Sequence, residues 1–400
     1  MKRLTLIFCI AIFTKTELAS ESLNLEQARL LALASSRSLA RYELAIRSSI
    51  LDERNQLYSM LPSVSAGYNT SVNYLQYSYS RSAWETVNPA DTFRAGMDFS
   101  ITQVIFQGGK SFIQRAISAI STESVRKDVL AEYFNVLNAL DNAYYAALEA
   151  AATLESEESS LEASILKLSI AEIRHESGMI SHGDYLRAMA EKESRENTRN
   201  IARRNLTLAK TRLKTLTGLS EIKSLEPIDF AIYEDVLVRF AGISDEDADA
   251  LFDNLWKIIA ANNPSLAKSA LGSQRAEKNL SITRRDYAPT VSATVFGTGF
   301  NYSSARGFNN DGFSTSGSGG ITVRGSIPVD FWNMNNRIEK STIARDLAAM
   351  DYSNAQLSLE MDLQTALLNA FEQAGSVLSS RRSLEYTERH FEYEIGRAHV

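Results

Sequence analysis

The sequence predicts an α+β protein in which very long helices alternate with pairs of β-strands. The strands are indicated by residues 61–74 and 93–106, where apolar and small polar side chains alternate over about a dozen positions each. The helices are indicated by a polar–apolar pattern that runs without proline from Gly108 to about His175. The same arrangement then begins a second time later in the chain. Together these observations favour a tandem repeat.

Composition narrows the classes of function. The chain has 400 residues, enough to bury more than one core, and a formal net charge of −6. It has no long basic stripe, so we expect no nucleic-acid partner. The single cysteine, Cys9, lies in the leader described next, so the mature chain is expected to use neither disulfide nor thiol chemistry.

The first residues have the features of a secretory signal. Lys2 and Arg3 precede an apolar run at 4–13, and small residues follow up to Ser20. This order predicts a signal peptide at 1–20, because the apolar run is too short for a stable membrane span. Lipid attachment at Cys9 is a less favoured alternative, because a bulky residue precedes the cysteine.

The first repeat is predicted over 21–218. Its first helix is expected over 23–60 and ends before Pro62, because the residue before a proline avoids helical backbone angles. A β-hairpin is predicted over 62–106, with a polar loop between its strands. The long helix that follows would be on the order of 100 Å in length, so it requires coiled-coil-like partners.

A turn interrupts the helical pattern of the first repeat. Gly178 and Gly183 lie close together with a serine between them, which predicts a tip at 177–183. A second helix is expected from Asp184 to about Leu216. It should stop at Gly218, because glycine just past a helix end is a common C-terminal signal.

The second repeat is predicted over 251–400, after an acidic, irregular connection at 219–250. Short motifs of the first repeat recur 227 positions later, for example Pro62 as Pro289. The offset holds without a gap over the first helix and the start of the first strand. A second β-hairpin is therefore predicted over 289–331, and a long helical pattern resumes near Asn335.

The offset also predicts where the second repeat should turn. A counterpart of Gly178 is expected at about position 404 or 405, whereas the sequence ends at Val400. We therefore expect the second repeat to be incomplete, without its turn and its return helix. Residues 395–400 resemble the translation of a common sequencing adapter, and we expect them not to be native.

The strand pairs fit either a soluble sheet or a membrane. Beyond the leader no apolar run of about 20 residues exists, so a membrane role would have to use strands. Charged residues on the polar strand faces would then line an aqueous lumen, because charge on the lipid face costs roughly a few kcal/mol. These residues are Arg94, Asp98 and Arg324. The alternative is that they snorkel to the membrane interface.

Aromatic residues gather near the ends of the predicted strands. They suit a girdle at the outer leaflet of a membrane, and a cluster of loop residues is the alternative. The members of this group are Tyr74, Tyr77, Tyr79, Trp84, Phe300 and Tyr302.

Several short motifs follow one another in a fixed order. They are the helix-to-strand prolines Pro62 and Pro289, the strand-to-helix segments 103–109 (with Gly108 and Gly109) and 328–333 (beginning at Pro328), Asn263-Pro264-x-Leu266, the turn 178–181 with 184–188, and Leu213-x-x-Leu216-Thr217-Gly218. Each motif is weak alone. Together, and partly in both repeats, they make a chain that resembles the TolC-like outer-membrane efflux protein family over nearly its whole mature length.

The resemblance implies an α+β membrane protein that is a homotrimer. Each protomer would give four transmembrane β-strands to one 12-stranded β-barrel in the outer membrane, and its long helices to a coiled-coil barrel in the periplasm. Physics agrees with a shared barrel, because four strands cannot close alone and open edges are excluded from lipid.

The function implied by the resemblance is passive. The channel would be the exit duct of a tripartite efflux pump or a type I secretion system, with a periplasmic adaptor (membrane fusion) protein and an inner-membrane transporter as partners, for drugs, metals or proteins. The alternative is a periplasmic coiled-coil scaffold whose hairpins are soluble tips.

The resemblance also assigns roles at the turn. Adaptor docking would use Ser177, Gly178, Met179, Ile180 and Ser181, with an ordinary helix–helix turn as the alternative. Asp184 lies where the family places acidic residues that help to hold the tunnel entrance shut. A helix N-cap is its alternative role, because aspartate caps helices well, and both roles can hold.

Signals for an enzyme are poor. No nucleophile and base converge in the sequence, and the glycine-rich segments 297–299 and 316–320 lack the Lys-Ser/Thr of a phosphate-binding loop. His175 and His182 are seven positions apart, off the spacing that puts two ligands on one helix face. We therefore expect no catalytic residue, no cofactor and no metal site.

Overall fold

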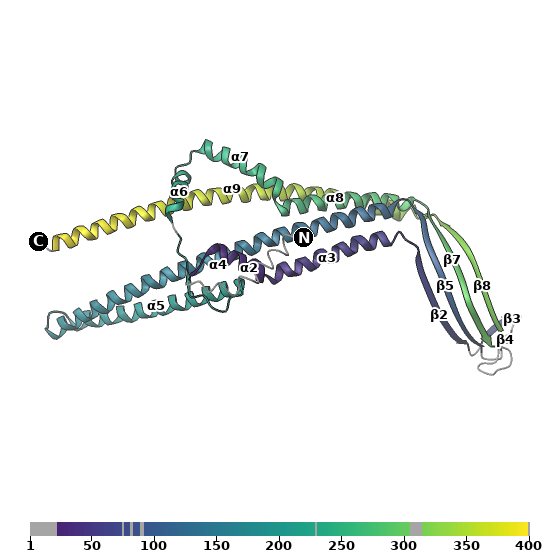
Figure 1. Cartoon of the computed structure of the whole chain (residues 1–400), viewed down its shortest axis with the longest axis horizontal. Coiled ribbons are helices and arrows are strands. Elements are labelled where there is room, and N and C mark those ends of the chain that lie inside the picture. Colours follow the sequence, from purple (N-terminus) through teal and green to yellow (C-terminus); the bar gives the residue numbers. More distant parts are fainter. Residues whose placement is uncertain are drawn as a thin grey trace. The chain divides into compact units, whose positions relative to one another are not determined.

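A computed structural model describes residues 22–73, 76–80, 83–88, 92–228, 230–304 and 314–398 (Figure 1). The predicted signal peptide lies outside these residues. The chain forms two compact units. The helical unit comprises Met1–Leu44, Lys127–Pro264 and Leu359–Val400, and the sheet unit comprises Ala45–Arg126 and Ser265–Ser358. Each unit contains residues of both predicted repeats, so the repeats do not coincide with the compact units.

The helical unit is built from long helices and two very short strands. Its elements are β1 (Ser22–Leu23), α2 (Leu25–Ser35), most of α4 (Lys110–Glu176), α5 (His182–Thr217), β6 (Ser224–Leu225), η1 (Phe230–Tyr233), α6 (Glu234–Ala241), α7 (Asp245–Asn262) and the later part of α9 (Phe331–Ala398). Strands β1 and β6 pair in parallel. Gly218 ends α5 in the left-handed conformation with φ 70°, as its position predicts.

The core of the helical unit lies where α2 meets α4 and α5. Ala28, Leu140 and Leu213 have no exposed surface, and Tyr144 is 2% exposed. The hydroxyl oxygen of Tyr144 lies 3.0 Å from the carbonyl oxygen of Leu23 and 2.9 Å from that of Glu226. This one side chain therefore anchors the two segments that carry β1 and β6. Burial raises the pKa of Tyr144.

An ion pair closes the edge of this core. The guanidinium of Arg29 on α2 donates to both carboxylate oxygens of Asp141 on α4, at 2.9 and 2.6 Å. These charge-assisted bonds raise the pKa of Arg29. The hydroxyl of Ser35 donates to the carbonyl of Leu216 at 2.8 Å, so α2 is held to both long helices.

The sheet unit contains a four-stranded antiparallel sheet in the order β2-β5-β7-β8. Figure 1 shows these strands side by side and curved in the same sense. The elements of the unit are most of α3 (Arg37–Tyr58), β2 (Ser63–Asn73), β3 (Gln76–Ser80), β4 (Ala83–Asn88), β5 (Thr92–Gln107), the start of α4, most of α8 (Pro264–Arg284), η2 (Arg285–Tyr287), β7 (Thr290–Ser304), β8 (Ser314–Ser326) and the start of α9. The pairing of β5 with β7 joins the two predicted hairpins into one sheet.

The segment between β2 and β5 differs from the predicted polar loop. Strands β3 and β4 form a separate antiparallel hairpin there. Aromatic and polar residues alternate in Gln76–Ser80, a pattern with strand propensity that the loop prediction overlooked. The side chains of the predicted aromatic girdle lie outside the described residues, so that role stays a prediction.

The prediction of a single helix over 23–60 is wrong, because the helix is interrupted at Ser36. Ser36 has extended backbone angles (φ −64°, ψ 111°), and its hydroxyl accepts from the amide of Leu39 at 3.3 Å. Asn263, which lies 227 positions later, has similar angles (φ −67°, ψ 120°) before Pro264. The break thus recurs in both predicted repeats, made by a capping serine in one and by a proline in the other.

The segment 219–250 is less irregular than predicted. It contains β6, η1, α6 and the first turn of α7. Ser244 caps α7, because its hydroxyl accepts from the amide of Asp247, so part of the acidic cluster is an ordinary helix start. Among the helices that the structure describes, none has a stretch long and apolar enough to cross a membrane.

Candidate functional site

The turn between α4 and α5 is closed by backbone hydrogen bonds. The amide of Gly178 donates to the carbonyl of His175 at 2.9 Å. The amide of Met179 donates to the carbonyl of Arg174 at 2.8 Å. This pair of bonds is the Schellman motif, which requires a left-handed residue, and Gly178 has φ 70°. An added Cβ would meet nothing within 4 Å, so the conformation and not the space calls for glycine here.

Helix α5 starts with a reciprocal cap. The hydroxyl of Ser181 accepts from the amide of Asp184 at 3.1 Å and donates to its carboxylate at 2.8 Å. Ser181 is therefore the N-cap, and the alternative that Asp184 is the N-cap is wrong. Asp184 occupies the third helical position, where its carboxylate can reach back to the cap. The negative charge also suits the positive end of the helix.

The turn presents an apolar side chain to its surroundings. Met179 is 74% exposed and Ile180 is half-buried. Behind them, the ammonium group of Lys167 on α4 donates to both carboxylate oxygens of Glu191 on α5, at 3.2 and 2.9 Å. These bonds lower the pKa of Glu191. The turn thus lies on two helices that are tied together.

Sequence reasoning missed a contact at this turn. Nε2 of His175, near the end of α4, lies 3.1 Å from Nδ1 of His182, the first residue of α5. The ring of Tyr185 lies 5.2 Å from that of His175 and 6.2 Å from that of His182, measured between centroids. The spacing of seven residues excluded a pair of ligands on one face of a single helix. The chain, however, reverses between the two histidines. The predicted turn itself was the signal that could have found the pair.

The sheet has one polar face. Strand register places Arg94, Asp98 and Arg324 on this face, so the structure puts the three predicted residues together on one side. All three side chains are exposed. Hydroxyl groups on the same face also contact each other across the strands. The side-chain oxygens of Ser65 and Ser100 are 2.7 Å apart, and those of Thr102 and Thr294 are 3.1 Å apart.

The opposite face of the sheet is apolar and open. Register places large side chains of all four strands on it, and they are exposed by 38–75%. They are Val64, Tyr68, Val72, Met97, Phe99, Ile101, Val295, Ile321 and Val323. Nothing in the described residues of this chain covers them. Alternation within each strand becomes a continuous apolar surface because the three strand pairings place these residues on the same side of the sheet.

The predicted junction residues all lie between helix and strand. Pro62, Pro289 and Pro328 are in short irregular segments, and Gly108 and Gly109 form the turn from β5 into α4. Gly108 has φ 65°, and an added Cβ would lie 2.5 Å from the Cβ of Ala288.

Ionic contacts hold the strand–helix junction next to these residues. The guanidinium of Arg285 donates to the carbonyl of Gly108 at 3.1 Å, and the ammonium of Lys110 lies 2.6 Å from the carboxylate of Asp286. Both contacts join residues of the first predicted repeat to residues of the second.

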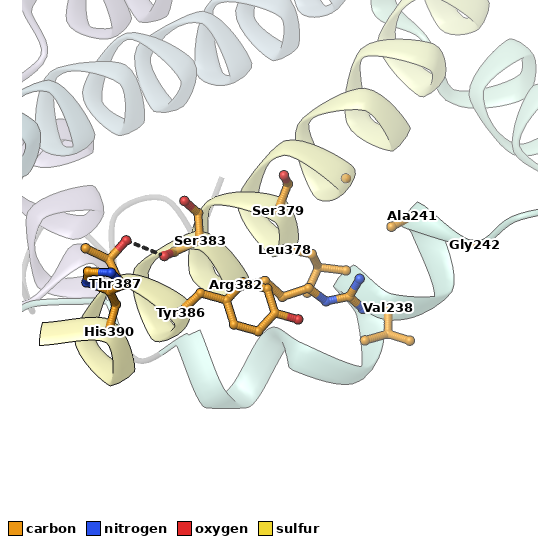
Figure 2. A pocket seen from close by; sticks show the side chains of 11 residues that line it. Val238, Ala241, Gly242, Leu378, Ser379, Arg382, Ser383, Tyr386, Thr387 and His390 are labelled. Atoms are coloured by element: carbon orange, nitrogen blue, oxygen red, sulfur yellow. Dashed lines mark hydrogen bonds between the residues drawn. The ribbon is translucent and has the colours of Figure 1, made fainter. Parts of the chain in front are cut away.

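A groove of about 1020 Å³ lies between α6 and α9 in the helical unit. Figure 2 shows Arg382 and Tyr386 of α9 reaching toward α6. At its border Arg381 pairs with Glu234 at 3.6 Å, and the rings of Phe240 and Phe371 meet edge to face at 5.4 Å between centroids. The groove marks the packing of α6 on α9, and it contains none of the predicted site residues.

Comparison with known proteins identifies the family. The sequence profile of the outer membrane efflux proteins matches residues 29–219 and 255–397, which is most of the chain. The chain belongs to the outer membrane efflux protein family. The predicted function, an outer-membrane exit duct for tripartite efflux, and the predicted location in the cell outer membrane are thereby confirmed. The family is one of transport proteins. A search by sequence among curated proteins found no match.

Solved structures of other outer membrane proteins show the same fold. VceC, an outer membrane protein of Vibrio cholerae, has a TM-score of 0.64 at 12% identity, over 91% of this chain and 83% of that one. CmeC, an outer membrane channel of Campylobacter jejuni, has a TM-score of 0.62 at 16% identity, over 92% and 76%. The open state of MtrE, an outer membrane channel of Neisseria gonorrhoeae, has a TM-score of 0.59 at 16% identity, over 92% and 79%.

Proposed function

We propose that three copies of this efflux protein close one 12-stranded transmembrane β-barrel. The observation that carries the proposal is an apolar sheet face that is exposed in one chain, on a sheet whose outer strands β2 and β8 each pair on one side within the described residues. Unpaired backbone groups cannot face lipid, so the edges must find partners. Because β2 and β8 run in opposite directions, β8 of one copy can pair antiparallel with β2 of the next.

The two faces of the sheet suggest the orientation of each strand. The apolar face would contact lipid, and the polar face with Arg94, Asp98 and Arg324 would line the aqueous lumen. Small hydroxyl side chains dominate this polar face, which leaves room for cargo to pass. The aromatic group from Tyr74 to Tyr302 would form the girdle at the outer leaflet.

The helices support contacts between copies. Helix α9 carries exposed apolar residues at heptad spacing, and they are 53–66% exposed in one chain. These residues are Ile343, Leu347, Met350, Leu357, Met361 and Leu368. Steps of three, four and seven residues form the seam of a coiled coil. Such a seam needs a partner helix, which a neighbouring protomer would supply in the periplasmic coiled-coil barrel.

We also propose the domain plan that the sequence predicts. After a signal peptide at 1–20, repeat 1 spans 21–218 and an equatorial segment spans 219–250. Repeat 2 follows over 251–400. The order of helix, helix, two strands of the four-stranded sheet and long helix occurs twice among the described elements, with the β3–β4 hairpin as an addition in the first copy, which supports a duplication. Residues Pro62, Pro289, Gly108, Gly109 and Pro328 would redirect the chain between the membrane and the periplasm.

The turn between α4 and α5 is the proposed docking site of the periplasmic adaptor, which would link the channel to an inner-membrane transporter. Residues Ser177–Ser181 project from the ends of two paired helices, and the exposed Met179 offers apolar contact. Asp184 would add to the latch at the tunnel entrance while it completes the cap of α5. The channel itself would be passive, without catalytic residues or a cofactor.

Edge pairing can be tested by disulfide cross-linking between copies. Cys9 is the only cysteine in the sequence and lies in the predicted leader. Any disulfide in the mature protein would therefore form between introduced cysteines. Ser65→Cys on β2 would be combined in turn with Ser318→Cys, Thr322→Cys and Ser326→Cys on β8. We expect one combination to give covalent dimers and trimers in outer-membrane fractions. Monomers for all three combinations, in a protein that fractionates as soluble, would instead support the periplasmic scaffold.

Docking can be tested at Met179. Met179→Asp should weaken cross-linking to the adaptor and lower efflux, because a charge replaces the exposed apolar contact, while the amount of trimer stays unchanged. Ile232→Asp is the matched control, since Ile232 is 72% exposed and lies outside the turn. Equal losses in both variants would argue against docking at this turn.

A further inference from the structure

The two histidines at the α4–α5 turn lie close enough to share one ion. Nε2 of His175 and Nδ1 of His182 are 3.1 Å apart. Two nitrogen ligands of one metal at ~2.0–2.1 Å are separated by roughly 2.9–3.4 Å, for ligand–metal–ligand angles between square and tetrahedral. The observed separation falls inside this window.

We propose that His175 and His182 form a binding site for a divalent transition cation of the Zn²⁺, Cu²⁺ or Ni²⁺ class. Imidazole is a preferred ligand of these ions, whereas Mg²⁺ and Ca²⁺ prefer oxygen. His182 is exposed and His175 is half-buried, so an ion can reach the pair from solvent.

The surrounding structure holds the pair in place. The left-handed Gly178 ends α4, and the hydroxyl of Ser181 caps α5, so both helix ends that carry the histidines are fixed. The ring of Tyr185 packs beside both imidazoles. A preorganised pair loses less side-chain entropy on binding an ion than two mobile residues would lose.

The protonation of the pair is determined by its geometry. Without an ion, one ring must donate a hydrogen to the other across the 3.1 Å contact. With an ion, both facing nitrogens must offer lone pairs, so His175 carries its hydrogen on Nδ1 and His182 on Nε2. Binding therefore needs the ring that donates in the empty pair to move its hydrogen to its other nitrogen, and it releases no net proton from two neutral rings.

The rest of the coordination shell is open. Among the described residues no third His, Cys, Asp or Glu joins the pair. The charged groups nearest in sequence are Arg174 and Glu176 on α4 and Asp184 on α5, and the carboxylate of Asp184 accepts from Ser181. Water would complete the shell in the isolated channel.

The test uses the full chain in detergent, purified without a polyhistidine tag and titrated with Zn²⁺ alone by calorimetry. We expect one ion per chain in the unaltered protein. His175→Ala and His182→Ala should each weaken binding by about tenfold or more, because even changes outside the ligand shell cost ~10–100-fold.

His390→Ala is the matched control, because it removes one described histidine that lies on α9 in the groove beside α6. The affinity of the His390→Ala variant for Zn²⁺ should equal that of the unaltered protein. Loading with Cu²⁺ should give an electron paramagnetic resonance spectrum with coupling to two imidazole nitrogens, reduced to one in either single variant. No Zn²⁺ binding, or binding that His175→Ala and His182→Ala leave unchanged, would overturn the proposal.

Discussion

Apolar side chains are covered in the core of the helical unit and open on one face of the four-stranded sheet. In the helical core Ala28, Leu140 and Leu213 have no exposed surface. On the sheet Val64 is 73% exposed and Ile321 is 75% exposed. Both regions follow a regular apolar periodicity, of 3.6 residues in one and two in the other. The difference lies in whether a single chain supplies the opposing surface.

The comparison shows which apolar surfaces a single chain covers by folding and which it leaves open. The helical core brings α2, α4 and α5 together and satisfies its buried hydroxyl within the chain. A sheet face whose large apolar side chains are 38–75% exposed is unfavourable in water, and an exposed apolar patch marks an interaction surface. In the outer membrane, where this family acts, lipid can supply the missing contact.

The largest effect is expected in the covered region. Leu140→Ala should lower the free energy of unfolding by about 2–5 kcal/mol, because it leaves a cavity among fully buried neighbours. Thermal unfolding of the purified protein measures the loss. Leu166→Ala, on the same helix but 63% exposed, is the control and should change the melting temperature little. Similar losses in both variants would show that the core does not lie at Leu140.

A charge on the open face should prevent membrane assembly. Phe99→Arg is expected to cost about 2–4 kcal/mol if the residue lies near the bilayer midplane, and less near the interface. Ser100→Arg places the same charge on the opposite, polar face and should be tolerated. The amount of heat-resistant trimer in outer membranes measures both. A stronger defect for Ser100→Arg would reverse the assignment of the two faces.

Removing the buried hydroxyl of the helical core should have an intermediate effect. Tyr144→Phe is expected to cost about 1–3 kcal/mol, because the carbonyls of Leu23 and Glu226 lose the hydroxyl that they share, although the carbonyl of Leu23 still accepts from the amide of Glu226. Tyr145→Phe, whose ring is 43% exposed, is the control. Thermal unfolding measures both variants, and equal stability of the two would contradict this role.

The same tyrosine predicts a dependence on alkaline pH. Since burial raises the pKa of Tyr144 in the folded protein, its contribution to stability is complete below the ordinary pKa of 10.0. The contribution is lost as the pH rises toward the pKa of the folded state, because the unfolded chain ionises first. Tyr144→Phe should remove this part of the alkaline destabilisation.

The smallest effect is expected on the polar face of the sheet. Ser100→Ala removes the hydroxyl contact with Ser65 at 2.7 Å. Cross-strand pairs of this kind contribute about 0.2–1 kcal/mol, and water in the proposed lumen can replace the contact. Trimer melting should therefore shift only slightly. A loss as large as that of Leu140→Ala would mean that the polar face is closed off from water.

Much of this architecture could be predicted from local pattern. Alternation in β2 and β5 predicted the strands, the missing prolines predicted α4, and Gly178 and Gly218 predicted where α4 and α5 end. These signals act within a few residues, because backbone conformation and helix capping depend on immediate neighbours. The motifs of the turn and the junctions were sufficient to name the family.

Other features depend on contacts between distant parts of the chain. The pairing of β5 with β7 joins residues from 183 positions apart (Gln107 with Thr290) to 211 positions apart (Phe93 with Ser304), and it determines which strands become the edges. The contact of His175 with His182 exists because two helices reverse, which a spacing rule for one helix cannot represent. The sequence could not decide whether Ser181 or Asp184 is the N-cap of α5. The structure decides it, because the hydroxyl of Ser181 accepts from the amide of Asp184. Periodicity in the sequence specifies which face of a helix or strand is apolar. The surface that packs against that face comes from distant parts of the chain. For the apolar face of the four-stranded sheet, it comes from outside the described residues of the chain.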